Sequence, residues 1–151
     1  NKMFNFGNKK YKFTGKTKTT FDVTLKQIIR ISDKQIGGWI EKESNLSHEG
    51  DCWVHCNARV YGDAGVSGKA EVYGNAVVRG DAEVTDKHNI FTLSCFKYNV
   101  TLTLTWARVG CFEFNPMEMD DLEYDGRIPR DEFDAIKIIL ATQYALMLSR
   151  A

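Results

Sequence analysis

The stretch NARVYGDAGVSGKAEVYGNAVVRGDAEVTDK, residues 57–87, repeats with a period of six residues. Valine occurs once in every period, at positions 60, 66, 72, 78 and 84. Alanine occurs two residues before each of these valines, at positions 58, 64, 70, 76 and 82. An α-helix repeats every 3.6 residues and a β-strand every two, so neither element alone explains this spacing. A period of six residues instead predicts a solenoid built from short strands.

Each hexad of the repeat has a small residue first, valine third and, in most copies, glycine fifth. The first and third residues of a strand lie on the same face, so we expect both to point into the coil. Glycine then supplies a corner with backbone dihedrals that other residues rarely adopt. Six hexads follow this scheme from Cys52 to Lys87, and two weaker hexads, residues 40–45 and 46–51, precede them. In this alignment His48 takes an inward third position.

The last residues of the hexads carry a second, longer period. The order Asn, Asp, Lys repeats after 18 residues, at Asn57, Asp63 and Lys69 and again at Asn75, Asp81 and Lys87. A triangular coil of three hexads stacks residues that are 18 apart, at a spacing of about 4.8 Å along its axis. Residues 40–87 therefore predict about 2.7 coils, whose open ends need covers.

The flanking segments are the expected covers. Residues 9–32 alternate in the manner of strands, with apolar members Tyr11, Phe13, Phe21, Val23, Leu25, Ile29 and Ile31. Residues 90–114 contain β-branched and aromatic runs that predict two or three antiparallel strands. Asn115 and Pro116 predict the start of a short helical turn, and apolar residues at helical spacing predict a helix over residues 129–148.

The predicted fold class is all-β with a C-terminal helix, organised as one compact unit. We expect N-terminal strands over residues 1–39, a short parallel β-helix over residues 40–88, and C-terminal strands with the helix over residues 89–151. The coil is thus capped at one end by the N-terminal strands and at the other by the strand–helix segment.

The repeat resembles known families. The motif VxG(D/N)A, seen as VYGDA, VYGNA and VRGDA, resembles the hexapeptide repeats of left-handed parallel β-helices. Residues 36–64, IGGWIEKESNLSHEGDCWVHCNARVYGDA, are similar to a group of small proteins from tailed phages and from prophages of gut bacteria, in which GGW(I/V)ExExNLS leads into the repeats. TLKQIIRI before this stretch and VGCFEF after it belong to the same resemblance. The resemblance implies a left-handed coil and a phage origin, and it implies no particular activity.

The composition restricts the classes of partner. The 151 residues include 20 basic and 20 acidic ones, and this balance does not favour a nucleic-acid binder or a membrane-surface protein. The Lys-rich segment 9–34 forms only a mild basic patch, and segment 113–134 is acidic. No apolar run approaches the roughly 18 residues of a membrane span, and no signal peptide opens the chain. We therefore expect a cytoplasmic protein of the host cell whose four cysteines are free thiols.

No catalytic, metal or cofactor site emerges from the sequence. The best-known hexapeptide-repeat proteins are acyltransferases, in which a histidine acts as base in a cleft between the subunits of a trimer. None of His48, His55 and His88 comes with the inserted loop that walls the acyl-donor site of those enzymes, and none has a defined partner. The spacing of Cys52 and Cys56 differs from that of a zinc knuckle, and no phosphate-binding fingerprint occurs. We expect no cofactor and no metal.

The outward positions of the hexads predict a binding surface. Sorted by the 18-residue period, one face collects Trp53, His55, Glu71 and Tyr73, and the next collects Arg59, Tyr61, Val77 and Arg79. The third face, with Gly65, Ser67, Glu83 and Thr85, is expected to be inert. Trp, Tyr and Arg are enriched in binding hot spots, so Trp53, His55, Tyr73, Arg59, Tyr61 and Arg79 form the predicted contact set. Alternatively, the terminal segments fold back over the aromatic face.

The sequence favours a non-enzymatic phage or prophage accessory protein that binds other proteins. The expected partners are further copies of the chain, in a homo-oligomer, and a host protein that is captured or inhibited, such as a defence protein. An acyltransferase-like hexapeptide-repeat protein is one alternative function. A virion or assembly component is another.

Overall fold

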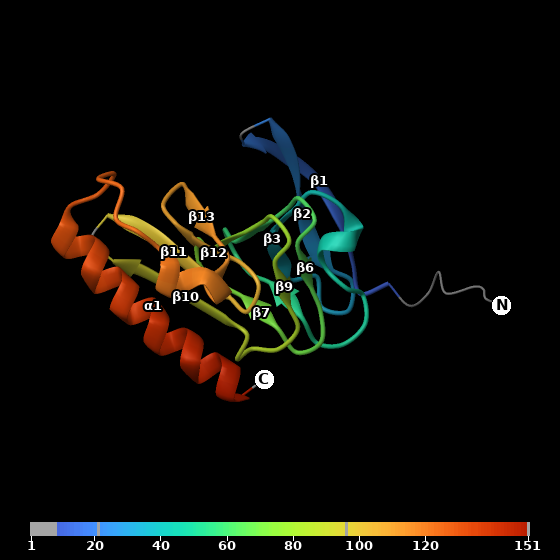
Figure 1. Ribbon diagram of the computed structural model, residues 1–151. Helices are drawn as coiled ribbons and strands as arrows, with labels where there is room; N and C mark the ends of the chain where they lie inside the picture. Colours follow the sequence, from blue (N-terminus) through green and yellow to red (C-terminus); the bar gives the residue numbers. More distant parts are fainter. Residues whose placement is uncertain (1–8, 21, 96, 151) are drawn as a thin grey trace.

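The structure, a computed structural model, describes residues 9–20, 22–95 and 97–150. Phe21 of the predicted N-terminal alternation and the side chain of Cys95 lie outside this part of the chain. Figure 1 shows the coil between an N-terminal hairpin on one side and a second sheet with the C-terminal helix on the other. The described chain is mostly β with a C-terminal helix, and none of its sheets closes on itself.

The repeat forms a coil of two-residue strands. These strands are β4 (Trp53–Val54), β5 (Arg59–Val60), β6 (Gly65–Val66), β7 (Glu71–Val72), β8 (Val77–Val78) and β9 (Glu83–Val84). β4 pairs with β7, β5 with β8 and β6 with β9, and every pair is parallel. Each paired residue lies 18 positions from its partner, as Val54 and Val72 do. The predicted 18-residue coil is confirmed.

The interior of the coil contains the residues that the hexad pattern predicts. The first and third residues of the six regular hexads are at most 6% exposed: Cys52, Val54, Ala58, Val60, Ala64, Val66, Ala70, Val72, Ala76, Val78, Ala82 and Val84. At the fifth position, Gly62, Gly68, Gly74 and Gly80 have φ between 63° and 67°, in the left-handed region that glycine adopts without strain. The corner role of these glycines is therefore confirmed.

The first coil departs from the predicted register. Ile40 pairs with Val60 and Leu46 bridges to Val66, in both cases across 20 residues rather than 18. Ile40 and Leu46 are fully buried, whereas His48 is only half-buried. The prediction that His48 fills an inward position is wrong. Two additional residues widen the corner after Leu46, because burying a large apolar side chain is more favourable than keeping a strict count of six.

The short 3-10 helix η2 (Glu43–Asn45) is tied to the coil by its last side chain. The Asn45 amide is fully buried, and its oxygen accepts hydrogen bonds from two backbone N–H groups of the same turn, at 3.1 and 2.9 Å. Its nitrogen donates to the carbonyl groups of Gly62 (3.2 Å) and Ala64 (2.8 Å) in the next coil. Because all four interactions are satisfied, this buried polar group holds the irregular first coil in place.

Cys56 occupies the corner position where four later hexads have glycine. Its φ is +50°, in a region where a Cβ atom crowds the backbone. We expect Cys56→Gly to raise the free energy of unfolding by about 1 kcal/mol, measured by urea denaturation. Cys56→Ala is the control, because it removes the thiol and keeps the Cβ atom. A glycine variant no more stable than the alanine variant would show that this corner is not strained.

The N-terminal sheet continues directly into the coil. Its strands are β1 (Tyr11–Thr20), β2 (Val23–Arg30) and β3 (Ile36–Ile40). They pair antiparallel in that order, and β3 then pairs parallel with β5 of the coil. A Cβ atom on Gly37 would lie 2.7 Å from the Trp53 ring, and one on Gly38 would lie 2.6 Å from the Ala58 carbonyl oxygen. The two glycines of IGGWI thus allow β3 to approach the coil closely.

A second antiparallel sheet follows the coil. Its strands, in spatial order, are β10 (Ile90–Cys95), β11 (Tyr98–Thr103), β12 (Ala107–Val109) and β13 (Phe112–Phe114). The prediction of two or three strands is wrong, because the segment forms four. Gly110, with φ +57°, makes a turn within RVGCFEF, so this run forms the two antiparallel strands β12 and β13. The predicted helical turn is η3 (Pro116–Asp121), and the Asn115 side chain accepts a hydrogen bond from the N–H of Met117 as its N-cap.

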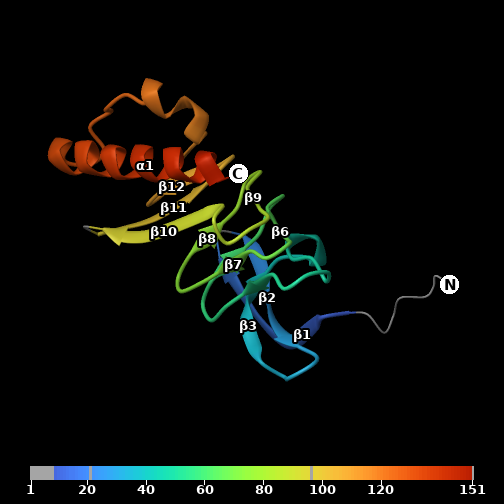
Figure 2. The same ribbon diagram turned by 90° about the horizontal axis from the view of Figure 1, so that it is seen from below.

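The helix α1 (Arg130–Arg150) covers one face of this second sheet, as Figure 2 shows. Ile136, Leu140 and Met147 are buried in one cluster with residues of β11, which confirms the predicted apolar side. On the outer side of the helix, Ile138 is 67% exposed and Leu148 is 52% exposed. Among the described residues, no helix combines the length and apolar character that crossing a membrane requires.

Trp106 joins the coil to the second sheet. It is 6% exposed and belongs to the same hydrophobic cluster as the valines of the coil. Its indole nitrogen lies 3.0 Å from where a Cβ atom on Gly80, at a corner of the last coil, would be. The backbone N–H of Trp106 donates to the hydroxyl of buried Thr103 at 3.0 Å, and this hydroxyl donates to the backbone carbonyl of Trp106 at 2.8 Å. Trp106 therefore closes the C-terminal end of the coil.

Candidate functional site

Trp53, the first residue of the predicted contact set, is part of the core. It is 1% exposed, because the N-terminal sheet lies over it. The Tyr11 ring meets it edge-on with 6.3 Å between ring centroids, and the Arg30 guanidinium lies 4.9 Å from its ring. The prediction of an exposed Trp53 is wrong, and for this residue the alternative of terminal segments folded back over the aromatic face is correct.

The neighbouring face of the coil is also partly covered. Tyr61 is 4% exposed, so the prediction that it is accessible is wrong. Arg79 forms an ion pair with Glu113 of β13, and its guanidinium lies 5.7 Å from the Tyr61 ring. The second sheet thus reaches this face through Glu113. Arg59 is half-buried and lies beside Trp39 of β3.

His55 and Tyr73 remain together on the first face. Their rings are stacked, with 4.2 Å between centroids and an interplanar angle of 10°, and Tyr73 is 54% exposed. The Nε2 atom of His55 lies 3.1 Å from Oε1 of Glu71. Hydrogen bonding to the Glu71 carboxylate, with smaller effects of desolvation and charge, raises the pKa of Tyr73. This cluster therefore presents an ordered aromatic ring with a protonated hydroxyl to the outside.

A groove of about 310 Å³ lies beside Tyr73. One wall is the corner of the coil over residues 73–76, and the other consists of Thr92, Leu93 and Asn99 of the second sheet. β10 forms this wall at the edge of its sheet, where β11 is its one strand neighbour within the described chain. The exposed ring and the groove together make a concave surface with both apolar and polar groups, as ligand-binding sites usually have.

A second groove, of about 330 Å³, crosses the face that the sequence predicts to be inert. Ser67 and Glu83 line one part of it, and His48 lines another. Nδ1 of His48 accepts a hydrogen bond from the backbone N–H of Lys10 at 3.1 Å. Its Nε2 atom has no hydrogen-bond partner in the described part of the chain and is 3.8 Å from Glu43. Burial lowers the pKa of His48. A neutral, poorly partnered imidazole does not make a catalytic dyad.

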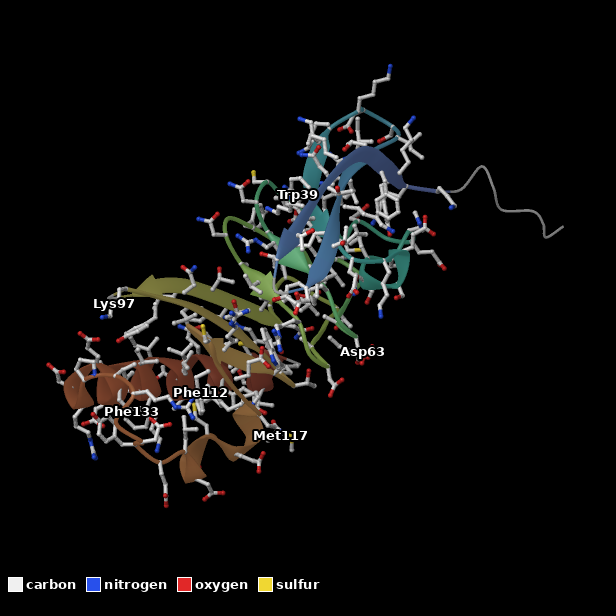
Figure 3. The ribbon with its side chains drawn as sticks, turned by 90° about the horizontal axis from the view of Figure 1, so that it is seen from above. Trp39, Asp63, Lys97, Phe112, Met117 and Phe133 are labelled. Carbon is white, nitrogen blue, oxygen red and sulfur yellow. The ribbon has the colours of Figure 1, made fainter. Side chains whose placement is uncertain are left out.

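A cavity of about 60 Å³ lies where α1 meets β12, β13 and the η3 segment. Figure 3 shows Phe112 on the sheet and Phe133 on the helix, and both residues line this space. Its lining is mainly apolar, which indicates a gap in side-chain packing rather than a site for polar chemistry. No group of three or more His, Cys, Asp and Glu side chains in the described chain is arranged to hold a metal ion.

Two parts of this surface were not predictable from the repeat alone. The 18-residue period places Glu71 on the same face as His55 and Tyr73, but it gives no distance between their side chains. The groove beside Tyr73 depends on how the second sheet docks against the coil. The docking involves β10 and β11, whose residues carry no sign of the hexad period.

Comparison with known proteins shows a similarity over a short part of the chain. No family model and no solved structure matches the chain. A protein of Escherichia coli strain K12, described as the uncharacterized acetyltransferase YdcK, is 43% identical over 51 residues. The match covers 29% of this chain and 16% of the length of YdcK. This similarity is compatible with a hexapeptide-repeat protein.

Proposed function

We propose that the chain is a non-catalytic binding module whose coil presents the cluster of Tyr73, His55 and Glu71 to a partner protein. The observation that carries this proposal is the position of Tyr73, which is 54% exposed, stacked on His55 and located beside a groove. An aromatic ring already held in one orientation loses little conformational freedom when it binds, which favours its use as a hot spot.

The biological setting is part of the same proposal. The VxG(D/N)A motif supports a left-handed coil, and the likeness of residues 36–64 to phage and prophage proteins supports an accessory role in the host cytoplasm. There the partner is a host protein, such as a defence protein that the module inhibits. Self-association is supported by the outer side of α1, where Ile138 and Leu148 are exposed.

Tyr73→Ala tests the binding surface. We expect the variant to fold normally and to lose at least tenfold in affinity for the partner, because hot-spot aromatic residues contribute about 2 kcal/mol or more. The amount of host protein captured by the tagged wild type and by the tagged variant is compared. Calorimetry with the captured partner then measures both affinities. Lys69→Ala, at an exposed corner of the coil, is the control. Equal capture by the Tyr73 variant would contradict the assigned surface.

Acyl transfer is a second candidate function. The similarity to YdcK and the 3.1 Å contact between His55 and Glu71 favour it, since a carboxylate can orient an imidazole as a base. Purified protein is incubated with acetyl-CoA and host extract, and release of free CoA is followed. Turnover that disappears in His55→Ala would replace the binding module as the conclusion, whereas no turnover favours binding.

A further inference from the structure

Two cations and an aromatic ring meet on the outer face of the sheet that joins the hairpin to the coil. Lys18 Nζ lies 4.3 Å from the centroid of the Trp39 ring. Trp39 and Arg59 are directly opposite each other in the parallel ladder of β3 and β5, so their side chains share one face. Figure 3 shows Trp39 where the hairpin meets the coil.

These two cations lack the counter-ions that neighbouring arginines have. Arg30 is paired with Asp33, and Arg79 is paired with Glu113. Within the described chain, no carboxylate lies at ion-pair distance from Lys18 or Arg59. Among the residues that the structure describes, the Nε–H group of Arg59 has no hydrogen-bond partner although it is buried, which is rare in folded proteins. Burial and the charge of Arg59 lower the pKa of Lys18, as expected where two like charges lie close together.

The surrounding charge extends this positive region. Residues 9–30 contain seven Lys and Arg residues and one acidic residue, Asp22. Two of the seven are neutralised, because Lys9 pairs with Glu43 and Arg30 with Asp33. Lys12 and Lys16 are exposed. The acidic residues of η3 and of the first turn of α1 lie on the far side of the coil from the hairpin, so they do not neutralise it (Figures 1 and 3).

We infer that Lys18, Trp39 and Arg59 form an anion-binding site for a carboxylate on an acidic segment of a different protein. This inference rests on the proposed function in one respect, that the partner is a protein. A guanidinium donates two parallel hydrogen bonds to a carboxylate, so Arg59 has the geometry for this anion. The same anion offsets the repulsion between the two cations. A strand of nucleic acid needs a longer row of phosphate contacts, and the chain as a whole has no net charge.

The test measures binding of a fluorescein-labelled octaglutamate peptide by anisotropy at about 50 mM NaCl, where surface charges are weakly screened. Arg59→Gln and Lys18→Gln are each expected to weaken binding about tenfold. Lys69→Gln, which removes the same charge at an exposed corner of the coil, is expected to change the affinity less than twofold. Thermal unfolding of each variant confirms that it is folded. The conservative variant Arg59→Lys is measured in the same way for comparison with Arg59→Gln.

Three results would overturn the inference. One is unchanged affinity in both folded Gln variants. Another is tenfold tighter binding of a labelled oligothymidylate of equal length, which would assign the site to nucleic acid. The third is a salt-sensitive oligomer that Arg59→Gln dissociates, which would assign it to the acidic segment of a second copy. Tyr73→Ala is expected to bind the peptide as the wild type does. The proposed anion site and the proposed Tyr73 binding surface can therefore be disproved independently of each other.

Discussion

Val72→Asp is expected to abolish cooperative folding. The Val72 side chain is fully buried in the coil, and its strand pairs with that of Val54. A carboxylate at this position would lie among the valines and alanines of the apolar interior, and burying it there costs several kcal/mol. The total stability of a domain is about 5–15 kcal/mol, so this cost is a large part of it. Circular dichroism and thermal unfolding measure the loss.

The control for this prediction is the adjacent residue. Tyr73→Asp introduces the same carboxylate one position further along, on the exposed side of the coil. We expect this variant to remain folded with nearly the wild-type melting temperature. If Val72→Asp unfolds in a single transition at the same temperature as Tyr73→Asp, the coil interior is not the dry, closely packed core that the structure shows.

Trp106→Ala is expected to lower the free energy of unfolding by about 3–5 kcal/mol, the usual cost of truncating a large buried aromatic residue. The indole closes the last coil, so its loss leaves a cavity and exposes the strand edges there. Urea denaturation measures the stability, and hydrogen exchange at the backbone N–H groups of β9 shows whether the last coil opens first.

Leu148→Ala is the matched control for Trp106→Ala. It also truncates a large apolar side chain, but one that is 52% exposed on α1. We expect a change of less than about 0.5 kcal/mol. A similar loss in both variants would contradict the role of Trp106 as the closure of the coil.

The periodic part of the fold was predictable because its cause is local. Valine recurs at the third position of each hexad, as at Val72, because every side of the coil has the same inward geometry. The buried residues of the coil could therefore be predicted from their spacing alone. The first coil was not predictable in this way. Its inward residues, Ile40 and Leu46, are separated from the regular hexads by two additional residues that no repeat signal marks.

The accessibility of the outward residues was harder to predict, because it depends on segments that are distant in sequence. Trp53 and Tyr61 lie at outward positions of their hexads, yet the N-terminal sheet covers the first, and the second is buried beside Arg79, which pairs with the second sheet. Tyr73 stays exposed on the same kind of position. Tyr61 and Tyr73 share the fourth position of their hexads and Trp53 has the second, and the repeat marks both positions as outward. The repeat therefore carries no information about which of these side chains is covered.

The parallel pairing of residues 18 apart has a consequence for how such proteins can vary in length. Inserting or deleting one complete coil moves the hairpin and the helix-bearing sheet apart or together by about 4.8 Å, without changing which faces they cover. The coil therefore acts as a molecular ruler. A lineage can adjust the distance between its two ends in fixed steps while each end keeps its own contacts.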